Sequence, residues 1–176
     1  MKAGSVALGL MVLVGCLSAT GAERELRPLV VLSGSNSGVT KPECLRVASQ
    51  EEWAAAWRRH AATQPKSAHG FGSHQMPAVD FTQCMVIVVF GGSTCNTDGL
   101  RVVASSDKGD EVVVGMDWMT YQTRGDGDKV TPFAFIVLPL SRKPILTQLD
   151  TRDLRERVDG RPPKWQEHCR FPMLEK

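Results

Sequence analysis

The sequence lacks the short motifs that identify the common classes of enzyme. It contains no Gly-x-Ser-x-Gly nucleophile elbow, no glycine-rich phosphate loop after a strand and no His-Glu-x-x-His zinc motif. It also lacks an isolated pair of acids in apolar surroundings, which general acid and base catalysis would need. We therefore predict no catalytic residues and a non-enzymatic protein.

Strong charge and metal-binding motifs are absent as well. The chain has 21 Lys and Arg against 19 Asp and Glu, a net charge of +2, and no run of Lys or Arg longer than two. This balance predicts no nucleic-acid partner. There is no Cys-x-x-Cys motif, and His168-Cys169 is the one place where Cys and His are adjacent, so we expect no metal and no cofactor.

The apolar run near the N-terminus, residues 3–15, is too short to span a bilayer. It follows Met1-Lys2 and precedes several small residues, an arrangement typical of a secretory signal peptide. We therefore expect an exported protein that is periplasmic, anchored to a membrane as a lipoprotein, or secreted.

Two cleavage sites for this signal compete. Leu13-Val14-Gly15-Cys16 resembles a bacterial lipobox, in which residues 1–15 are removed and Cys16 becomes the lipidated first residue. Cleavage after Ala22 would instead remove residues 1–22 and release a soluble protein. The lipoprotein is the favoured alternative, and a lipid on Cys16 is the only membrane contact that we expect.

The cysteines that remain after cleavage are even in number and bound for an oxidising compartment, which favours two disulfides over a zinc site. They are Cys44, Cys84, Cys95 and Cys169. Four cysteines allow three pairings, of which we favour Cys44 with Cys84 and Cys95 with Cys169. A free Cys95 could instead act as a nucleophile, with His60, His69, His74 or His168 as its base.

Residues 84–90 form a short apolar run rich in β-branched side chains, which predicts a strand buried on both faces. Asp80, just before it, is expected to hydrogen-bond nearby backbone amides. Five further strands are expected at residues 29–32, 43–47, 100–104, 111–118 and 133–138, of which 100–104 and 111–118 make a hairpin.

One amphipathic helix is predicted at about residues 50–62. Ser49 and Glu52 have capping-box spacing, and Trp53 and Trp57 lie one turn apart on the face that we expect to pack on the sheet. The predicted fold class is therefore α+β, mainly β, with one antiparallel sheet or a small sandwich or barrel covered by this helix.

The order of these features resembles the PrcB-like C-terminal domain family. The resemblance covers about residues 29–139, expected here as one β-rich domain from 27 to 140. Its motifs are Ser33-Gly34-Ser35-Asn36-Ser37-Gly38, Glu52-Trp53 with Trp57, Pro77-Ala78-Val79-Asp80-Phe81, Gly91-Gly92 and Thr131-Pro132-Phe133. The charged segment 141–176 lies outside the resemblance, and we expect it to pack back on the domain as a tail.

This resemblance implies an exported, often lipid-anchored, non-enzymatic domain, named after an accessory lipoprotein of a bacterial surface protease complex. The family tends to have a Thr-Gly-Gly-Tyr-like turn after the central strand, where this chain has Asn96-Thr97-Asp98-Gly99-Leu100.

We therefore expect a cell-envelope accessory module that binds an envelope protein or protease complex through loops at one end of its sheet. The candidate contact residues are Asn96, Thr97, Asp98, Arg124 and Asp126. An exported protease inhibitor is the first alternative, and a metal- or thiol-dependent enzyme is the second.

Overall fold

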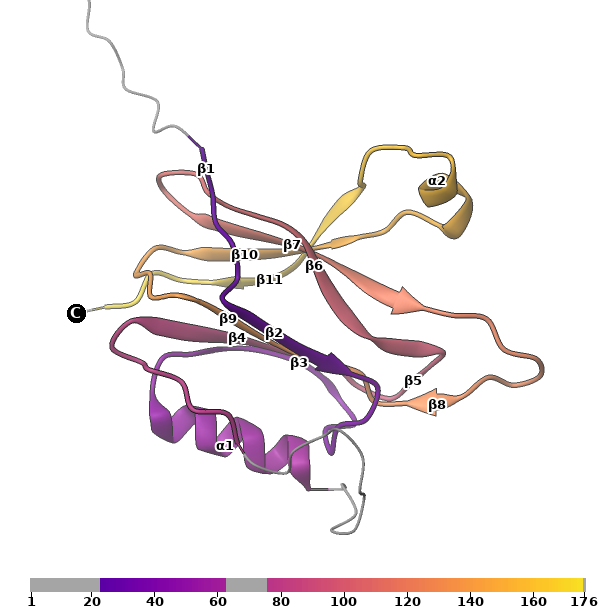
Figure 1. The fold of residues 1–176 in the computed structure, drawn as a ribbon, viewed down its shortest axis with the longest axis horizontal. Coiled ribbons are helices and arrows are strands. Elements are labelled where there is room, and N and C mark those ends of the chain that lie inside the picture. The colour runs from indigo at the N-terminus through magenta and orange to yellow at the C-terminus, as the bar shows by residue number, and fades with distance from the viewer. Residues whose placement is uncertain (1–22, 63–75, 176) are drawn as a thin grey trace, which may run out of the picture.

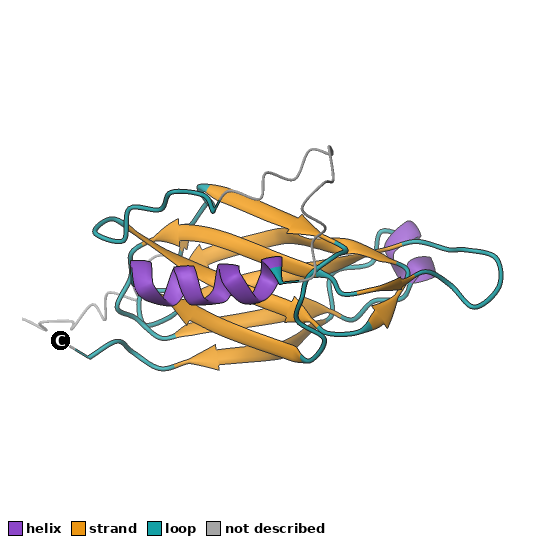
Figure 2. Ribbon diagram, turned by 90° about the horizontal axis from the view of Figure 1, so that it is seen from below, coloured by secondary structure: helices purple, strands orange, loops and turns teal. Residues whose placement is uncertain are grey.

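The computed structural model describes residues 23–62 and 76–175, and the expected signal peptide, Cys16, His69 and His74 lie outside them. Two β-sheets stack face to face, and a helix covers the outer face of one sheet (Figures 1 and 2). The fold is α+β and mainly β, as predicted. It is a sandwich of two sheets and not a single antiparallel sheet. No helix in the described ranges is long and apolar enough to cross a membrane.

The sheet next to the helix has four strands, in the spatial order β2, β9, β4, β3. Their bounds are β2 (Val30–Gly34), β9 (Phe133–Pro139), β4 (Cys84–Gly91) and β3 (Pro42–Val47). The five-stranded sheet has the order β1, β6, β7, β10, β11. Its bounds are β1 (Arg24–Glu25), β6 (Thr97–Asp107), β7 (Val112–Thr120), β10 (Ile145–Asp150) and β11 (Trp165–Phe171).

The strand β4 is buried on both faces, as its apolar sequence predicts. Because successive side chains of a strand point to opposite faces, its residues divide between two hydrophobic clusters. Met85, Ile87 and Val89 pack toward the five-stranded sheet. Val86, Val88 and Phe90 pack toward the helix, and all six side chains are 0% exposed.

The helix α1 (Gln50–Ala61) begins where the capping residues predict. Ser49 Oγ accepts a hydrogen bond from Glu52 N at 3.2 Å. Trp53 is buried, its Nε1 donates to Pro77 O at 2.9 Å, and its ring meets Phe135 edge-on at 5.0 Å. Trp57 also packs on Phe135, so the two tryptophans belong to the core.

The C-terminal segment is part of the sandwich, which corrects the expectation of a tail packed on a finished domain. β10 pairs with β7 in parallel, and β11 pairs with β10 in antiparallel fashion at the edge of the five-stranded sheet. Ile145 and Leu146 are buried in this arrangement. The expected boundary near residue 140 is therefore not a structural boundary.

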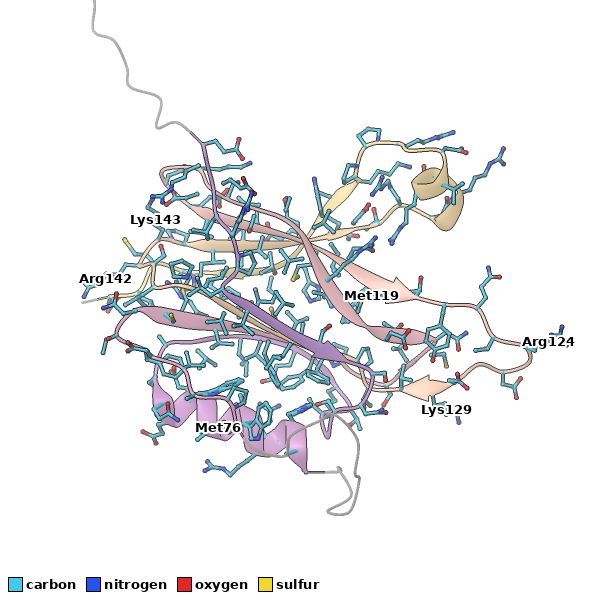
Figure 3. All side chains as sticks on the ribbon, in the orientation of Figure 1. Met76, Met119, Arg124, Lys129, Arg142 and Lys143 are labelled. Atoms are coloured by element: carbon cyan, nitrogen blue, oxygen red, sulfur yellow. The ribbon has the colours of Figure 1, made fainter. Side chains whose placement is uncertain are left out.

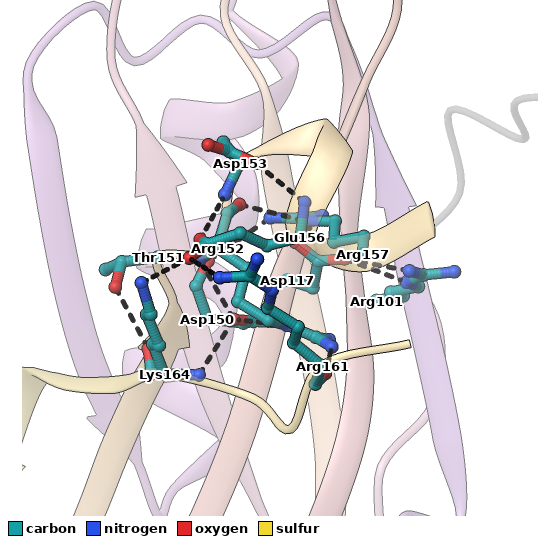
Figure 4. Close-up of polar contacts among 10 residues, drawn as sticks. All are labelled: Arg101, Asp117, Asp150, Thr151, Arg152, Asp153, Glu156, Arg157, Arg161 and Lys164. Atoms are coloured by element: carbon teal, nitrogen blue, oxygen red, sulfur yellow. Dashed lines mark hydrogen bonds and ion pairs between the residues drawn. The ribbon is translucent and has the colours of Figure 1, made fainter. Parts of the chain in front are cut away.

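Between β10 and β11 lies the short helix α2 (Leu154–Val158), where arginine side chains pair with the buried carboxylates of Asp117 and Asp150 (Figure 4). Asp117, on the outer face of β7, pairs with Arg157 at 2.5 Å and with Arg101 at 2.8 Å. Asp150 pairs with Arg152 at 2.6 Å. Burial alone would raise the pKa of Asp150, but hydrogen bonds from the Arg152 side chain and from two backbone amides lower it to about 2.

His60, in the last turn of α1, gives stability a pH dependence. It is 3% exposed beside the rings of Phe133 and Phe135, and burial lowers its pKa from 6.5 to about 4. Between these two values the unfolded chain binds a proton that the folded protein does not, so stability falls as the pH falls from 6.5 to 4. From pH 7 to pH 4, the wild type should lose about 3 kcal/mol more unfolding free energy than His60→Gln.

Urea unfolding followed by circular dichroism at both pH values measures this difference. Because both proteins share the titration of all other groups, the comparison isolates His60. Equal losses in the two proteins would show that His60 does not titrate in this way.

Candidate functional site

The two loops that the sequence suggested as contact regions lie together at one end of the sandwich. β5 (Thr94–Cys95) pairs with β8 (Lys129–Val130) in a two-stranded ribbon, with Thr94 opposite Val130 and Cys95 opposite Lys129. We call residues 94–98 and 121–131 the loop tip. It projects beyond the ends of both sheets, and Arg124 lies at its far end (Figures 1 and 3).

Asn96 joins the two halves of the loop tip. In residues 23–62 and 76–175 it is the only non-glycine residue with a positive φ, at 55°, a conformation that asparagine tolerates better than most residues. Its backbone N donates to Asp128 O at 3.0 Å, and its O accepts from Tyr121 N at 3.0 Å. Its side-chain Oδ1 accepts from Asp128 N at 2.8 Å and from Thr123 Oγ1 at 3.2 Å.

Gly127 makes the close approach to Asn96 possible. Its φ is 80°, and a Cβ atom at this position would lie 2.8 Å from Asn96 Oδ1. A larger residue would therefore be strained and would also displace the side chain that joins the loops. The backbone of the loop tip is fixed by its own hydrogen bonds.

The loop tip displays charges of both signs around the single tyrosine of the chain. Asp98, Arg124, Asp126 and Lys129 are exposed. Tyr121 is half-buried, and its OH donates to Asp128 Oδ2 at 3.2 Å. Burial and the neighbouring Asp128 carboxylate raise the pKa of Tyr121, so its hydroxyl remains a hydrogen-bond donor at neutral pH.

Comparison of the chain with protein-family models, with curated proteins and with solved structures gives no match.

One predicted contact residue, Thr97, does not face a partner. Its side chain is 5% exposed, and its Oγ1 donates to Cys95 O at 3.2 Å. Thr97 supports the turn from inside, and Asp98 next to it is exposed. Asn96 has a structural role that its motif did not reveal, because the conformation and the partners of a loop asparagine depend on a segment about 30 residues away.

The predicted disulfide pairing is wrong. Cys44 lies opposite Val89, whereas Cys84 lies opposite Pro139 at the far end of β4. Five residues of strand separate Val89 from Cys84, about 16 Å at 3.3 Å per residue, and a disulfide needs Cα atoms within about 7 Å.

Cys95 does not pair with Cys169 either. Cys95 is exposed in the ribbon of the loop tip, and no disulfide joins the four cysteines of the described residues. Cys169 instead lies beside Cys44, and the adjacent His168 is close to both. The Sγ atoms of the two cysteines and a ring nitrogen of His168 lie within 4.8 Å of one another. His168-Cys169 was visible in the sequence, but Cys44, more than 120 residues earlier, was not a predictable neighbour.

Asp80 has the structural role that its position predicted. Its Oδ1 accepts from Thr82 N at 2.9 Å and from Thr82 Oγ1 at 2.6 Å. Its backbone O accepts from Cys84 N at 2.8 Å, where β4 begins. The hydrogen bonds from Thr82 hold the pKa of Asp80 below its ordinary value, so the carboxylate is ionised at neutral pH and shapes this turn.

The Asn96 side chain can be tested separately from its backbone conformation. Asn96→Gly permits the positive φ but removes both side-chain bonds, whereas Asn96→Asp keeps an accepting oxygen. We expect the Asp128 amide hydrogen to exchange up to about tenfold faster in Asn96→Gly, because one hydrogen bond contributes roughly 1 kcal/mol against local opening. In Asn96→Asp its exchange should stay close to wild type.

Hydrogen exchange followed by NMR reports both amides of interest in one experiment. The Gly109 amide, which donates to Asp107 Oδ1 at 2.9 Å in the turn at the opposite end of the molecule, is the internal reference. An Asp128 amide that exchanges equally fast in wild type and Asn96→Gly would mean that the side chain does not hold the two loops together.

Proposed function

We propose that this protein is an exported, non-enzymatic accessory module of the bacterial cell envelope that binds another protein through the loop tip. The main observation is the pre-organisation of the tip by Asn96, which fixes the backbone of a long loop before any partner arrives. Ordering a flexible loop on binding costs free energy, and a loop that is already ordered avoids much of that cost.

The base of the loop tip also favours this role. The tip connects to β4 and β9, the two central strands of the four-stranded sheet, and to the ends of β6 and β7. Loops carried by a rigid sheet are common binding sites because the sheet holds them in one position. Exposed Arg and Asp beside a half-buried tyrosine are chemically suited to a protein surface of mixed charge.

The resemblance to the PrcB-like C-terminal domain family supports the same proposal, since it implies an accessory role beside a protease complex in the envelope. A protease complex is therefore the partner that we propose to test first. A projecting, pre-organised loop would also suit occlusion of a protease active site, so inhibition is measured in the same experiment.

The test is a pull-down from envelope extract with the full chain as the cell processes it. Arg124→Ala with Asp126→Ala removes the two exposed charges at the end of the loop tip. The matched control is Lys108→Ala with Asp110→Ala, an exposed charge pair in the turn between β6 and β7 at the other end of the same strands. We expect wild type and control to capture the same partner, and the tip variant to bind it at least about tenfold more weakly.

Two results would contradict the proposal. One is a specific partner that the tip variant captures as well as the wild type does. The other is the absence of any specific partner with the loop tip intact. If the captured protein is a protease and its activity falls on binding, the accessory module acts as an inhibitor.

A further inference from the structure

A second group of side chains lies where the edges of the two sheets meet, away from the loop tip. Cys44 belongs to β3, the last strand of the four-stranded sheet, and His168 and Cys169 belong to β11, the last strand of the five-stranded sheet. Arg46, two residues after Cys44, holds these edges together: its Nη1 donates to Lys143 O at 3.1 Å and to Pro172 O at 2.9 Å.

A β-bulge explains how His168 and Cys169 both reach Cys44. Adjacent residues of a regular strand point to opposite faces, so only one of them could approach the same neighbour. Here Thr147 pairs with Cys169 and Gln148 pairs with Glu167, which leaves His168 as the extra residue of a bulge. A bulge can turn a side chain toward a new direction.

Thr147 holds the bulge in place. Its Oγ1 accepts from Cys169 N at 3.0 Å and donates to Cys169 O at 3.1 Å. Thr147 is fully buried, and Cys44, His168 and Cys169 are half-buried around it. The three potential ligands are therefore set on a fixed backbone.

The chemistry of the group favours a cation. The group combines two cysteine sulfurs with one imidazole, and none of the three is a permanently charged cation. A neutral imidazole can donate a ring lone pair to a metal ion. His168 Nε2 is buried without a hydrogen-bond partner in the described part of the chain.

A disulfide between Cys44 and Cys169 would use the two sulfurs and leave the histidine with no role. We propose that Cys44, His168 and Cys169 bind a Zn²⁺ ion that joins the edges of the two sheets. Two thiolates and an imidazole are a set of ligands that zinc favours, and the two negative charges balance the ion. Binding releases two protons from the thiols, and nothing is oxidised or reduced.

The spacing of the ligand atoms agrees with this ion. Tetrahedral zinc with Zn–S bonds of about 2.3 Å places its sulfurs about 3.8 Å apart, and the three ligand atoms lie within 4.8 Å of one another. Three protein ligands leave the fourth position for water or for a group from a binding partner.

Cobalt provides the direct test, because tetrahedral Co²⁺ with thiolate ligands has a charge-transfer band in the near ultraviolet and intense visible bands. The full chain, reduced and freed of metal, is titrated with Co²⁺ under nitrogen and then with Zn²⁺. We expect the charge-transfer band and the visible bands to saturate at one equivalent of Co²⁺. All of them should disappear when Zn²⁺ replaces Co²⁺.

Variants then identify the ligands. His168→Ala should weaken Zn²⁺ binding at least about a hundredfold, since loss of an outer-shell partner alone costs 10- to 100-fold. Cys44→Ser and Cys169→Ser should each reduce the charge-transfer band. Cys84→Ser with Cys95→Ser, which removes the two other described cysteines, should leave binding unchanged. Circular dichroism checks that each variant folds, and His168→Gln replaces His168→Ala if the latter does not.

The proposal is overturned if the reduced chain does not bind Co²⁺, or if the His168 variants bind Zn²⁺ as the wild type does. It is also overturned if the protein isolated from cells carries no zinc and its intact mass and peptide map show a Cys44–Cys169 disulfide.

Discussion

The structure depends on the burial of β4 on both faces. A strand whose six central side chains, Met85 to Phe90, are all apolar must be covered by a separate layer on each side, because exposing either row to water would forfeit its hydrophobic free energy. α1 and its tryptophans supply one layer. The five-stranded sheet supplies the other, and it includes strands from the C-terminal segment of the chain.

Both candidate sites are consequences of this layered arrangement. The loop tip lies where the chain leaves β4 and where it enters β9, so the loops that we propose as binding surface extend from the most buried strands. The proposed zinc site lies at the border between the layers, where β3 and β11 are the last strands of their sheets. One site is pre-organised by Asn96 and the other by a bulge that Thr147 holds.

Sequence patterns predicted the parts of the fold whose signals are local. The apolar runs of β4 and β9, the alternation of β7 and the cap of α1 each depend on residues within a few positions of one another. β10 and β11 were missed because Ile145-Leu146 is a short apolar pair among polar residues, and its burial comes from pairing with β7, about 30 residues earlier. The neighbours of Cys44 and the conformation of Asn96 likewise depend on contacts between distant segments, which no local pattern reports.

Paired substitutions in β4 test whether this strand is covered on both faces. Val88 and Val89 are adjacent, identical in type and both 0% exposed, but Val88 faces α1 and Val89 faces the five-stranded sheet. We predict that Val88→Ala and Val89→Ala each lower the unfolding free energy, measured by urea denaturation, by about 2 kcal/mol. Val103→Ala, at a position that is 44% exposed in β6, should change it by less than about 0.5 kcal/mol. If only one of the two β4 variants were destabilised, β4 would be covered on one face alone, and the three-layer arrangement would be wrong.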